Sequence, residues 1–338
     1  MKEKKKIRAI GLLSGGLDSA LAVRLLLEQG IEVIGVKFTS PFCNCDQKGR
    51  CFSREIAEQL GISYITTVKG RDYLKIIRNP RHGYGSGVNP CLDCRIFMLK
   101  KAWKIAKEQG ASFLVTGDVL GQRPMSQRRD AFALIDRETG LGGRILRPLS
   151  ARYLPETMPE KRGWVDREKL LSITGRGRKD QFALAREKNL DVFACAAGGC
   201  LLTDRYFAAK MRDLFARKKR IDWPDVLLLK TGRHFRHRDA AIVIGRNERD
   251  NRDILIRKKP GDYLFQVPDI PGPVTLLTGR KRRDSVLFAA RLTAYYADTV
   301  EESVNVRYGR LPETPEHSVM VRPATKEEAD RHNIVLEK

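Results

Sequence analysis

The sequence has few acidic residues relative to basic ones, few histidines and no long apolar run. Of its 338 residues, 41 are Asp or Glu, 64 are Lys or Arg, and only 5 are His. No apolar stretch approaches the roughly 20 residues that a membrane-spanning helix needs, and the charged start MKEKKKIRAIGLL lacks the pattern of a secretory signal. These absences argue against membrane and secreted classes, so we expect a cytoplasmic globular protein with no membrane partner.

The stretch GLLSGGLDSALA at residues 11–22 places a glycine pair between two apolar runs. The run before the pair is typical of a buried strand, and the run after it has helical spacing up to Gly30. A strand, a glycine turn and a helix start expose backbone N–H groups, which favours phosphate binding. The stretch contains neither the Gly-Lys-Ser/Thr of a P-loop nor a Gly-x-Gly-x-x-Gly dinucleotide motif.

Ser-Gly-Gly-Leu-Asp-Ser at residues 14–19 resembles the PP-loop of the ATP pyrophosphatase superfamily. The resemblance implies that Asp18 helps to place Mg²⁺ and that the pyrophosphate of ATP is held by Ser14, Gly15, Gly16, Asp18 and Ser19. It also implies that main-chain groups around Val36 and Phe38 bind adenine. Asp118, at the end of LVTGD, would then lie near the metal or the ribose.

Seven cysteines, an odd number, indicate thiol or metal chemistry rather than a disulfide scaffold. Cys91 and Cys94 in NPCLDC stand three apart at the start of a predicted helix, so they share one face of its first turn. The helix dipole lowers the pKa of thiols at such a position and suits them to nucleophilic or metal-binding work. Taken alone, the pair is equally compatible with two buried packing thiols.

NPCLDC followed by LVTGD resembles, together with the PP-loop, the tRNA thiolation branch of the same superfamily. The resemblance implies an ATP-dependent tRNA sulfurtransferase that makes 4-thiouridine or 2-thiouridine, with 2-thiocytidine also open. A later cysteine completes the set in that branch. Cys200 in AAGGCLLTD is the best match here, and Cys195 is the competing candidate.

Two mechanisms fit the trio Cys91, Cys94 and Cys200. Three thiolates that hold a 4Fe–4S cluster leave one iron open to carry sulfide. In cluster-free relatives, one cysteine carries a persulfide and a second releases the sulfur as a disulfide forms. The two cysteines at the first position favour the cluster, and the sulfur donor would be sulfide or a persulfide carrier.

A second group of cysteines, Cys43, Cys45 and Cys51, lies in PFCNCDQKGRC, just after the second predicted strand. Their density suggests a Zn²⁺ site with a fourth ligand elsewhere, for which His82 and Asp46 are candidates. A sulfur relay to the active site and inert packing are the alternatives.

The formal net charge of +23 indicates a polyanionic partner, which the resemblance identifies as tRNA. The basic clusters GQRPMSQRRD and GRGRKD offer candidate contacts to RNA phosphates, although each could equally be a solvated surface charge. These candidates are Arg123, Arg128, Arg129, Arg176, Arg178 and Lys179.

The chain alternates apolar runs with helical stretches, which predicts an α/β fold with a doubly wound parallel sheet and a ligand at the carboxyl ends of its strands. The predicted strands are 7–13, 32–39, 63–68 and 112–117, and the predicted helices are 18–29, 53–60 and 92–109. A further helical segment is expected over DREKLLSITGRGRKDQFALAREKNL, residues 166–190.

We expect a catalytic domain over residues 1–220, including a helical extension over about 165–220, and a smaller α+β domain over 221–338. Short β-like runs, Arg-rich turns and the helix DSVLFAARLTAYYA characterise this second domain. The domain contains TGRHFRHRDAAIVIGRNERDN and resembles the NFACT RNA-binding module. This resemblance implies that the domain binds tRNA and takes no part in catalysis.

Three other classes compete with thiolation. PP-loop ligases such as GMP or NAD synthetases need neither the cysteines nor the charge, and lysidine-type tRNA ligases do not need the cysteines. A non-catalytic RNA- or ribosome-binding protein would need no ATP turnover. Only thiolation uses the loop, the cysteines and the positive charge in one reaction.

Overall fold

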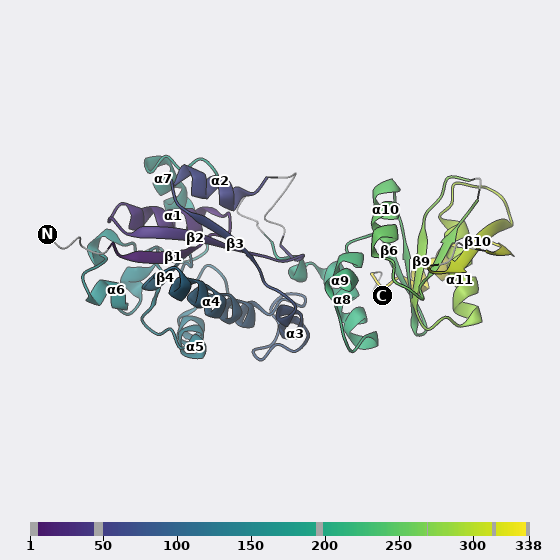
Figure 1. Ribbon diagram of the computed structural model, residues 1–338, viewed down its shortest axis with the longest axis horizontal. Helices are drawn as coiled ribbons and strands as arrows, with labels where there is room; N and C mark the ends of the chain where they lie inside the picture. The colour runs from purple at the N-terminus through teal and green to yellow at the C-terminus, as the bar shows by residue number, and fades with distance from the viewer. Residues whose placement is uncertain (1–5, 44–49, 194–198, 269, 313–315, 336–338) are drawn as a thin grey trace. The chain divides into compact units, whose positions relative to one another are not determined.

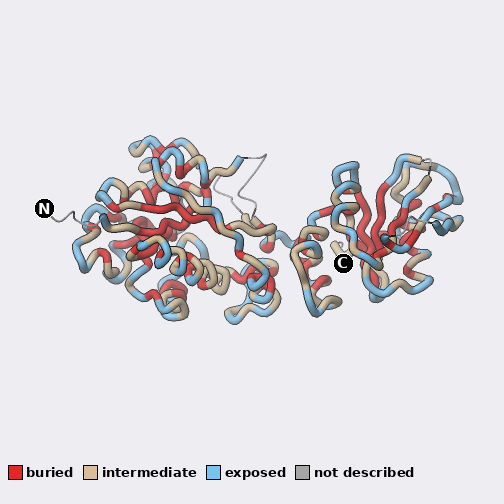
Figure 2. Tube along the Cα trace, viewed as in Figure 1, coloured by how far each residue is buried: buried red, intermediate tan, exposed pale blue. Residues whose placement is uncertain are grey.

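The computed structural model describes residues 6–43, 50–193, 199–268, 270–312 and 316–335. The chain divides into two compact units, Met1–Thr203 and Asp204–Lys338 (Figure 1). Each unit has its own sheet, and strands in the middle of each sheet, such as β1 and β7, are largely buried (Figure 2). Among the described residues, no helix is both long and apolar enough to cross a membrane.

The N-terminal unit contains a five-stranded sheet in the order β3-β2-β1-β4-β5. Its neighbouring strands are all parallel, as in the register Ala9↔Val33 and Ala9↔Phe113. The strands are β1 (Arg8–Leu12), β2 (Glu32–Thr39), β3 (Tyr64–Val68), β4 (Phe113–Thr116) and β5 (Ile145–Leu146). The predicted doubly wound α/β fold is therefore confirmed, with the chain reversing direction across the sheet between β1 and β4.

Helices cover both faces of this sheet because successive strand residues point to opposite sides. Ala9 packs with α1 (Leu17–Leu27), α2 (Phe52–Gln59) and α7 (Lys179–Glu187). Ile10 packs on the other side with α4 (Cys91–Glu108) and α5 (Arg129–Thr139). The short helices of this unit are α3 (Asp72–Arg78) and α6 (Met158–Lys161).

The helical segment expected over 166–190 is wrong for most of its length. Only α7, Lys179–Glu187, is an α-helix, preceded by a single 3₁₀ turn at Arg167–Lys169. Thr174 instead forms a parallel bridge with Leu120, and Gly175 has a left-handed φ of 82°. This extended connection brings Arg178 toward the carboxyl edge of the sheet, where the pocket described below lies.

The C-terminal unit is built on a six-stranded antiparallel sheet in the order β11-β10-β8-β9-β7-β6. Its strands are β6 (Arg233–His237), β7 (Ala240–Ile244), β8 (Tyr263–Gln266), β9 (Thr275–Gly279), β10 (Val304–Arg310) and β11 (His317–Val321). One face packs on α11 (Arg283–Tyr295), and the other contacts α10 (Glu248–Arg257). The expected separate α+β domain is confirmed, and α12 (Lys326–His332) lies beside β6.

The helix α8 (Arg205–Arg217) falls within the C-terminal unit, although the composition change predicts a boundary after residue 220. Its Asp213 accepts a hydrogen bond of 2.6 Å from Arg236 on β6. Lys210 donates to the Leu229 carbonyl, just after α9 (Trp223–Leu228). These contacts tie α8 to the second sheet, which composition alone does not indicate.

Candidate active site

The glycine turn after β1 forms a tight loop that leads into α1. Gly15 has a φ of 84°, which L side chains rarely adopt, and a Cβ there would lie 3.3 Å from the Cβ of Phe52. The Ser19 hydroxyl accepts from the Ser14 N–H at 3.3 Å and donates to the Gly16 carbonyl at 2.7 Å. The loop is thus held by its own serines at the N-terminus of an eleven-residue helix, where backbone dipoles favour an anion.

Gly117, directly after β4, packs against the start of α1. A Cβ on Gly117 would lie 2.4 Å from the carbonyl carbon of Asp18 and 2.5 Å from the amide nitrogen of Ser19. Because both atoms belong to the backbone, no side chain fits at this position. The Thr-Gly-Asp sequence at residues 116–118 therefore packs the end of β4 directly against the glycine turn after β1, which we call the phosphate loop.

Asp18 has one carboxylate oxygen that is buried and has no hydrogen-bond partner among the described residues, Oδ1. Its Oδ2 lies 3.7 Å from the guanidinium of Arg178. A buried acceptor without a partner is costly unless something else satisfies it. This orphaned oxygen, next to the phosphate loop, fits the Mg²⁺ that the resemblance assigns to Asp18.

Asp118 occupies the middle of the site and is 2% exposed. Its Oδ1 accepts from Arg95 and from the Gln127 amide, the latter at 2.9 Å, and its Oδ2 accepts from the Thr116 hydroxyl at 2.8 Å. Burial and the nearby Arg123 lower the pKa of Arg95 to about 10, so Arg95 stays charged at neutral pH. The Asp118 carboxylate therefore has protein partners on both oxygens, and it orients Arg95 in the pocket wall.

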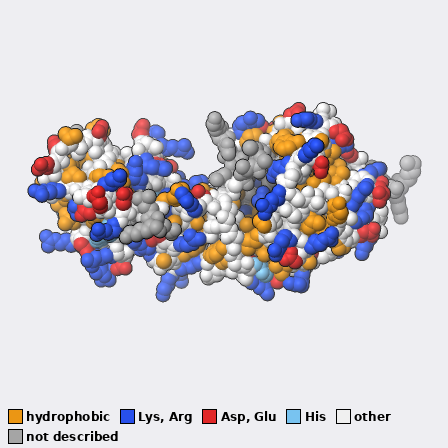
Figure 3. All heavy atoms as spheres, turned by 180° about the vertical axis from the view of Figure 1, so that it is seen from behind, with side chains coloured by type: hydrophobic (Ala, Val, Ile, Leu, Met, Phe, Trp, Pro, Cys, Tyr) orange, Lys and Arg blue, Asp and Glu red, His pale blue; other side chains and the backbone are white. Residues whose placement is uncertain are grey.

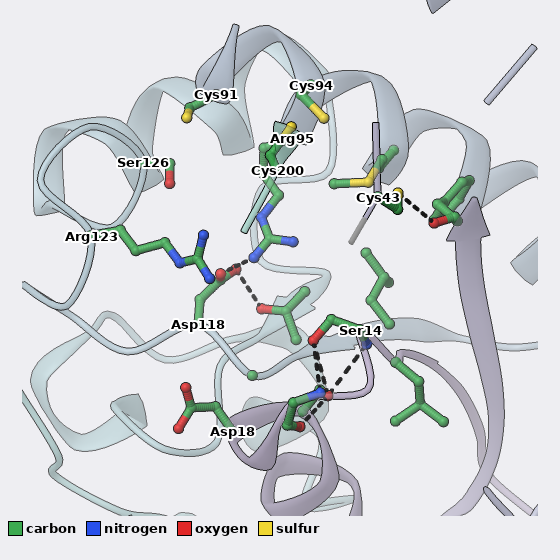
Figure 4. Close-up of a pocket in the computed structure, with 18 of the residues that line it drawn as sticks. Ser14, Asp18, Cys43, Cys91, Cys94, Arg95, Asp118, Arg123, Ser126 and Cys200 are labelled. Atoms are coloured by element: carbon green, nitrogen blue, oxygen red, sulfur yellow. Dashed lines mark hydrogen bonds and ion pairs between the residues drawn. The ribbon is translucent and has the colours of Figure 1, made fainter. Parts of the chain in front are cut away.

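One cavity of about 280 Å³ connects the phosphate loop to the cysteines. Ser14 and Asp18 lie at one end, Cys91, Cys94 and Cys200 lie at the other, and Asp118, Arg95 and Arg123 lie between them (Figure 4). Of the predicted site residues, those that line the cavity are Ser14, Gly16, Asp18, Ser19, Val36, Phe38, Cys43, Cys91, Cys94, Asp118, Arg123, Arg178 and Cys200. The structure thus brings the two predicted chemistries into one space.

The wall beside the loop comes from β2. Val36 and Phe38 line the cavity, and Val36 is almost fully buried. The Val36 carbonyl accepts from the Leu13 N–H at 2.9 Å, so this oxygen already has a protein partner. Adenine recognition by main-chain groups here stays a prediction.

Lys69 is a buried cation among the sulfurs. Its ammonium donates to the Cys94 sulfur at 3.2 Å and lies 4.4 Å from the centre of the Tyr73 ring. Burial alone would lower the pKa of Lys69, but the sulfurs of Cys94, Cys43 and Cys200 outweigh burial and raise it. Lys69 therefore supplies a fixed positive charge to the cysteine end of the cavity.

The Cys91 thiol is not activated by the helix dipole as the sequence predicts. Burial, reinforced by Cys94, raises the pKa of Cys91. Burial also raises the pKa of Cys200 to about 12, although Lys69 opposes it. The expectation of lowered thiol pKa values is thus wrong for Cys91, because loss of solvent outweighs the field of the α4 N-terminus.

Cys43 and Cys51, which the sequence groups together, have different surroundings. The Cys43 sulfur lies 3.3 Å from the Ser40 hydroxyl and lines the cavity. The Cys51 sulfur instead accepts from Lys37 at 3.3 Å and lies 3.6 Å from the Tyr64 hydroxyl. Cys45, with Asp46, lies outside the described residues, so the zinc site stays a prediction.

Among the described residues, which include Cys91, Cys94 and Cys200 but not Cys45 or Cys195, no three His, Cys, Asp or Glu side chains are arranged to hold a metal ion. The three proposed cluster ligands share a cavity without converging on one point. As they lie, these residues do not form a cluster site.

The predicted RNA contacts divide into two groups. Arg123 and Arg178 line the cavity, whereas Arg128 is exposed and pairs with Asp130 at 2.7 Å. The remaining three, Arg129, Arg176 and Lys179, are exposed and do not line the cavity. Lys and Arg side chains are spread widely over the visible surface of the chain (Figure 3).

The residues of the site that were not predicted include Lys69, Arg95 and Gln127. Lys69 directly follows β3, so its place at the carboxyl edge could have been predicted from the strand end. Arg95 follows Cys94 in the first turn of α4, but nothing in its spacing indicates that it reaches Asp118. Gln127 lies between β4 and α5, and no local sequence pattern indicates that it belongs to the site.

Comparison with known proteins gives two family matches. Residues 5–152 match the family described as thiamine biosynthesis protein (ThiI), and residues 232–333 match the NFACT protein RNA binding domain. A tRNA-specific 2-thiouridylase from Bradyrhizobium sp. (strain ORS 278) is 33% identical over 129 residues, which cover 34% of this chain and 32% of the relative. The probable tRNA sulfurtransferase of Thermococcus kodakarensis (strain ATCC BAA-918 / JCM 12380 / KOD1) is 32% identical over 148 residues, covering 42% of this chain and 36% of the relative.

A solved 4-thiouridine synthetase, in complex with RNA and ATP, aligns with a TM-score of 0.37 and 20% identity over 66% of this chain and 52% of that one. The chain spans about a third of the length of the two curated relatives named above. The two family matches fall one in each structural unit. The chain therefore joins an N-terminal PP-loop domain of the ThiI family to a C-terminal NFACT-type RNA-binding domain.

Proposed function

We propose that the chain is an ATP-dependent tRNA sulfurtransferase, which replaces a carbonyl oxygen of a uridine in tRNA with sulfur. The observation that carries this proposal is the single cavity with a phosphate loop at one end and four cysteines near the other, Cys43, Cys91, Cys94 and Cys200. The matched relatives, a tRNA thiouridylase and a tRNA sulfurtransferase by name, support the same reaction class.

The first half-reaction takes place at the loop end. The uracil carbonyl oxygen attacks the α-phosphate of ATP and pyrophosphate leaves. The oxygen then carries AMP, which makes the base carbon bonded to it electrophilic. Backbone N–H groups at the start of α1 and the guanidinium of Arg178 stabilise the charge that develops on the leaving pyrophosphate. Mg²⁺ held by Asp18 would supply further charge neutralisation there.

The second half-reaction takes place at the cysteine end. A sulfur nucleophile attacks the adenylated carbon, and AMP leaves with the original oxygen. The ammonium of Lys69 stabilises negative charge on this sulfur, and Arg95 and Arg123 lie between the two ends to receive the AMP phosphate. The two half-reactions thus share one bound base.

We propose that the sulfur is carried as a cysteine persulfide, because the three predicted cluster ligands Cys91, Cys94 and Cys200, which are all described residues, are not arranged to hold a metal ion. Purification under anaerobic conditions, followed by iron and sulfide analysis, tests this choice. Protein that makes thiouridine without bound iron supports the persulfide. About four irons per chain, lost in Cys91→Ala, would instead support the cluster that the resemblance implies.

We propose tRNA as the substrate, held partly by the C-terminal domain. A target base must leave its stack to reach a pocket of this kind, which costs a few kcal/mol. Contacts of the NFACT-type domain and of the basic residues Arg128 and Arg129 with RNA phosphates would offset that cost.

The test is mass spectrometry of nucleosides from tRNA incubated with the full chain, ATP, Mg²⁺ and sulfide or polysulfide. A thionucleoside that depends on ATP supports the proposal, and its mass and retention identify the base and the modified atom. Asp18→Asn should abolish the product, whereas Asp72→Asn, on an exposed helix surface, should not. Tight tRNA binding with no ATP-dependent product would favour a non-catalytic RNA-binding protein instead.

A further inference from the structure

Cys43 and Cys200 face each other across an isolated antiparallel bridge in the N-terminal unit. The Leu201 N–H donates to the Phe42 carbonyl at 2.9 Å next to this pair. Directly opposed residues in antiparallel pairs have Cα atoms about 4.5–5.5 Å apart. A disulfide needs a Cα separation of about 4.4–6.8 Å, and the spacing typical of such a bridge falls within this range.

Both cysteines also line the catalytic cavity, together with Lys69 and Cys94. The Lys69 ammonium interacts with the charges of Cys43 and Cys200 as well as with Cys94. Cys91 has a different electrostatic setting, because Arg123 and Arg95 are the cations that act on it. The sulfurs therefore divide into a Cys91 position near the arginines and a Lys69-centred group of Cys43, Cys94 and Cys200.

We propose that Cys43 is the resolving thiol of Cys200, and that the two form a disulfide when sulfur is released to the tRNA base. This role rests on the proposed function in its persulfide form. Nothing in the local sequence indicates it, because Cys43 stands 157 residues before Cys200 and beside Cys45 and Cys51. Only the bridge between two distant segments pairs them.

A persulfide donor transfers its outer sulfur to Cys200 and leaves as a thiol. The Cys200 persulfide then attacks the adenylated base, AMP leaves, and a base–S–S–Cys200 mixed disulfide forms. The Cys43 thiolate attacks the Cys200 sulfur, giving the Cys43–Cys200 disulfide and releasing the thiolated base. The sulfane sulfur gains two electrons from the two thiols, and an external dithiol then reduces the disulfide and resets the pair.

The electrostatics of the pair are consistent with this order of events. Burial raises the pKa of Cys200 to about 12, so the loading step, in which the Cys200 thiolate attacks the donor, is slow at neutral pH, and Lys69 assists it by acting against burial. In the resolving step, Cys200 is the sulfur that is attacked and need not ionise. Lys69 is positioned to stabilise the Cys43 thiolate that attacks it.

Two measurements on the full chain test this role. In the first, native protein is oxidised with oxidised glutathione, and its disulfides are mapped by mass spectrometry. We expect a Cys43–Cys200 linkage as the main product. A linkage of Cys200 to Cys94 or to any other cysteine, or no linkage at all, would overturn the pairing whether or not the chain thiolates tRNA.

In the second, protein loaded with inorganic polysulfide reacts once with ATP and tRNA in the absence of reductant. Wild type should release thionucleoside and end with the Cys43–Cys200 disulfide. Cys43→Ser should release roughly tenfold less and accumulate a protein–tRNA adduct that dithiothreitol cleaves. Cys51→Ser is the matched control and should behave as wild type, because Cys51 contacts Lys37 and Tyr64 instead of Cys200.

Release from Cys43→Ser at the wild-type rate without an adduct would overturn the resolving role. Cys43→Ala serves as a second variant, and circular dichroism verifies that both variants are folded. A wild-type chain that forms neither thionucleoside nor adduct contradicts the proposed function instead. The disulfide map then still decides whether the pair exists.

Discussion

The two ends of the proposed catalytic cavity are built in different ways. The phosphate end is a four-residue loop, residues 13–16, between β1 and α1, fixed by serine hydrogen bonds and by close backbone packing at Gly117. The cysteine end is assembled from segments far apart in the chain, around Cys43, Lys69, Cys94 and Cys200. The first is a local structure, and the second exists only when the whole unit is folded.

This difference determines what each end tolerates. The phosphate end depends on backbone positions, so adding a single methyl group can disrupt it. The cysteine end depends on side chains whose charges and separations can change without altering the fold. Substitutions at the phosphate end should therefore disturb the local backbone, whereas substitutions at the cysteine end should change reactivity and leave the fold intact.

The largest effect is expected for Gly117→Ala. The added Cβ would lie 2.4 Å from the backbone of Asp18, so the start of α1 must shift, at a cost of about 1–3 kcal/mol in the free energy of unfolding. We expect loss of ATP binding and of thiolation, measured by calorimetry and nucleoside analysis. Gly142→Ala, where the added Cβ meets nothing within 4 Å, is the control. Normal ATP binding by Gly117→Ala would show that the phosphate end is less rigid than we describe.

A large effect on chemistry alone is expected for Asp18→Asn. The amide keeps the shape of the side chain but removes the charge that fits Mg²⁺, so thiolation should fall by about a hundredfold or more while the protein stays folded. Thermal denaturation and product analysis measure the two quantities. Asp72→Asn should change neither. An active Asp18→Asn variant would remove Asp18 from the reaction.

A graded effect is expected from pH at the cysteine end. Because burial raises the pKa of Cys200 to about 12, its alkylation by iodoacetamide should speed up about tenfold per pH unit between pH 7 and pH 10, without a plateau. Burial raises the pKa of Cys51 too, but hydrogen bonds with Ser53, Tyr64 and Lys37 outweigh burial and lower this pKa. Cys51 should therefore react sooner and level off at lower pH. Peptide mass spectrometry measures both rates, and identical profiles would contradict the assigned environments.

The smallest effect is expected for Arg128→Ala. Arg128 is exposed, pairs with Asp130 and does not line the cavity, so it should affect tRNA binding but not the KM for ATP. Loss of one phosphate contact should weaken tRNA binding a few-fold and reduce the slope of log Kd against log salt by about 1. A titration at several salt concentrations measures the slope. An unchanged slope would remove Arg128 from the RNA surface.

The sequence predicted the phosphate end well because its signals are local. The strand before Ser14, the glycine turn and the helix after it are adjacent in the chain, and β1 and α1 have nearly the predicted bounds. Hydrophobic periodicity likewise gave four of the five parallel strands. It missed β5, which is only two residues long. It also predicted a helical segment over 166–190, where the structure has the α-helix α7 only over Lys179–Glu187.

The cysteine end was only partly predictable because its members meet through tertiary contacts. The Cys91–Cys94 spacing correctly placed both thiols on α4. Closeness in sequence, however, grouped Cys43 with Cys51, whereas in the structure Cys43 pairs with Cys200 across a bridge and Cys51 contacts Lys37. The direction of the Cys91 pKa shift depends on burial, which the helix start alone does not reveal. The pairing of residues far apart in the chain and the burial of individual side chains are the two properties that local sequence patterns do not reveal.

The most direct test of the central claim is to measure pyrophosphate release and thionucleoside formation in the same single-turnover reaction. If the two ends perform successive half-reactions, Asp18→Asn should lose both products. Cys200→Ser should still release pyrophosphate in a tRNA-dependent burst but form no thionucleoside. Thionucleoside from Cys200→Ser at the wild-type level, or pyrophosphate release unaffected by Asp18→Asn, would contradict the division of the cavity into these two ends.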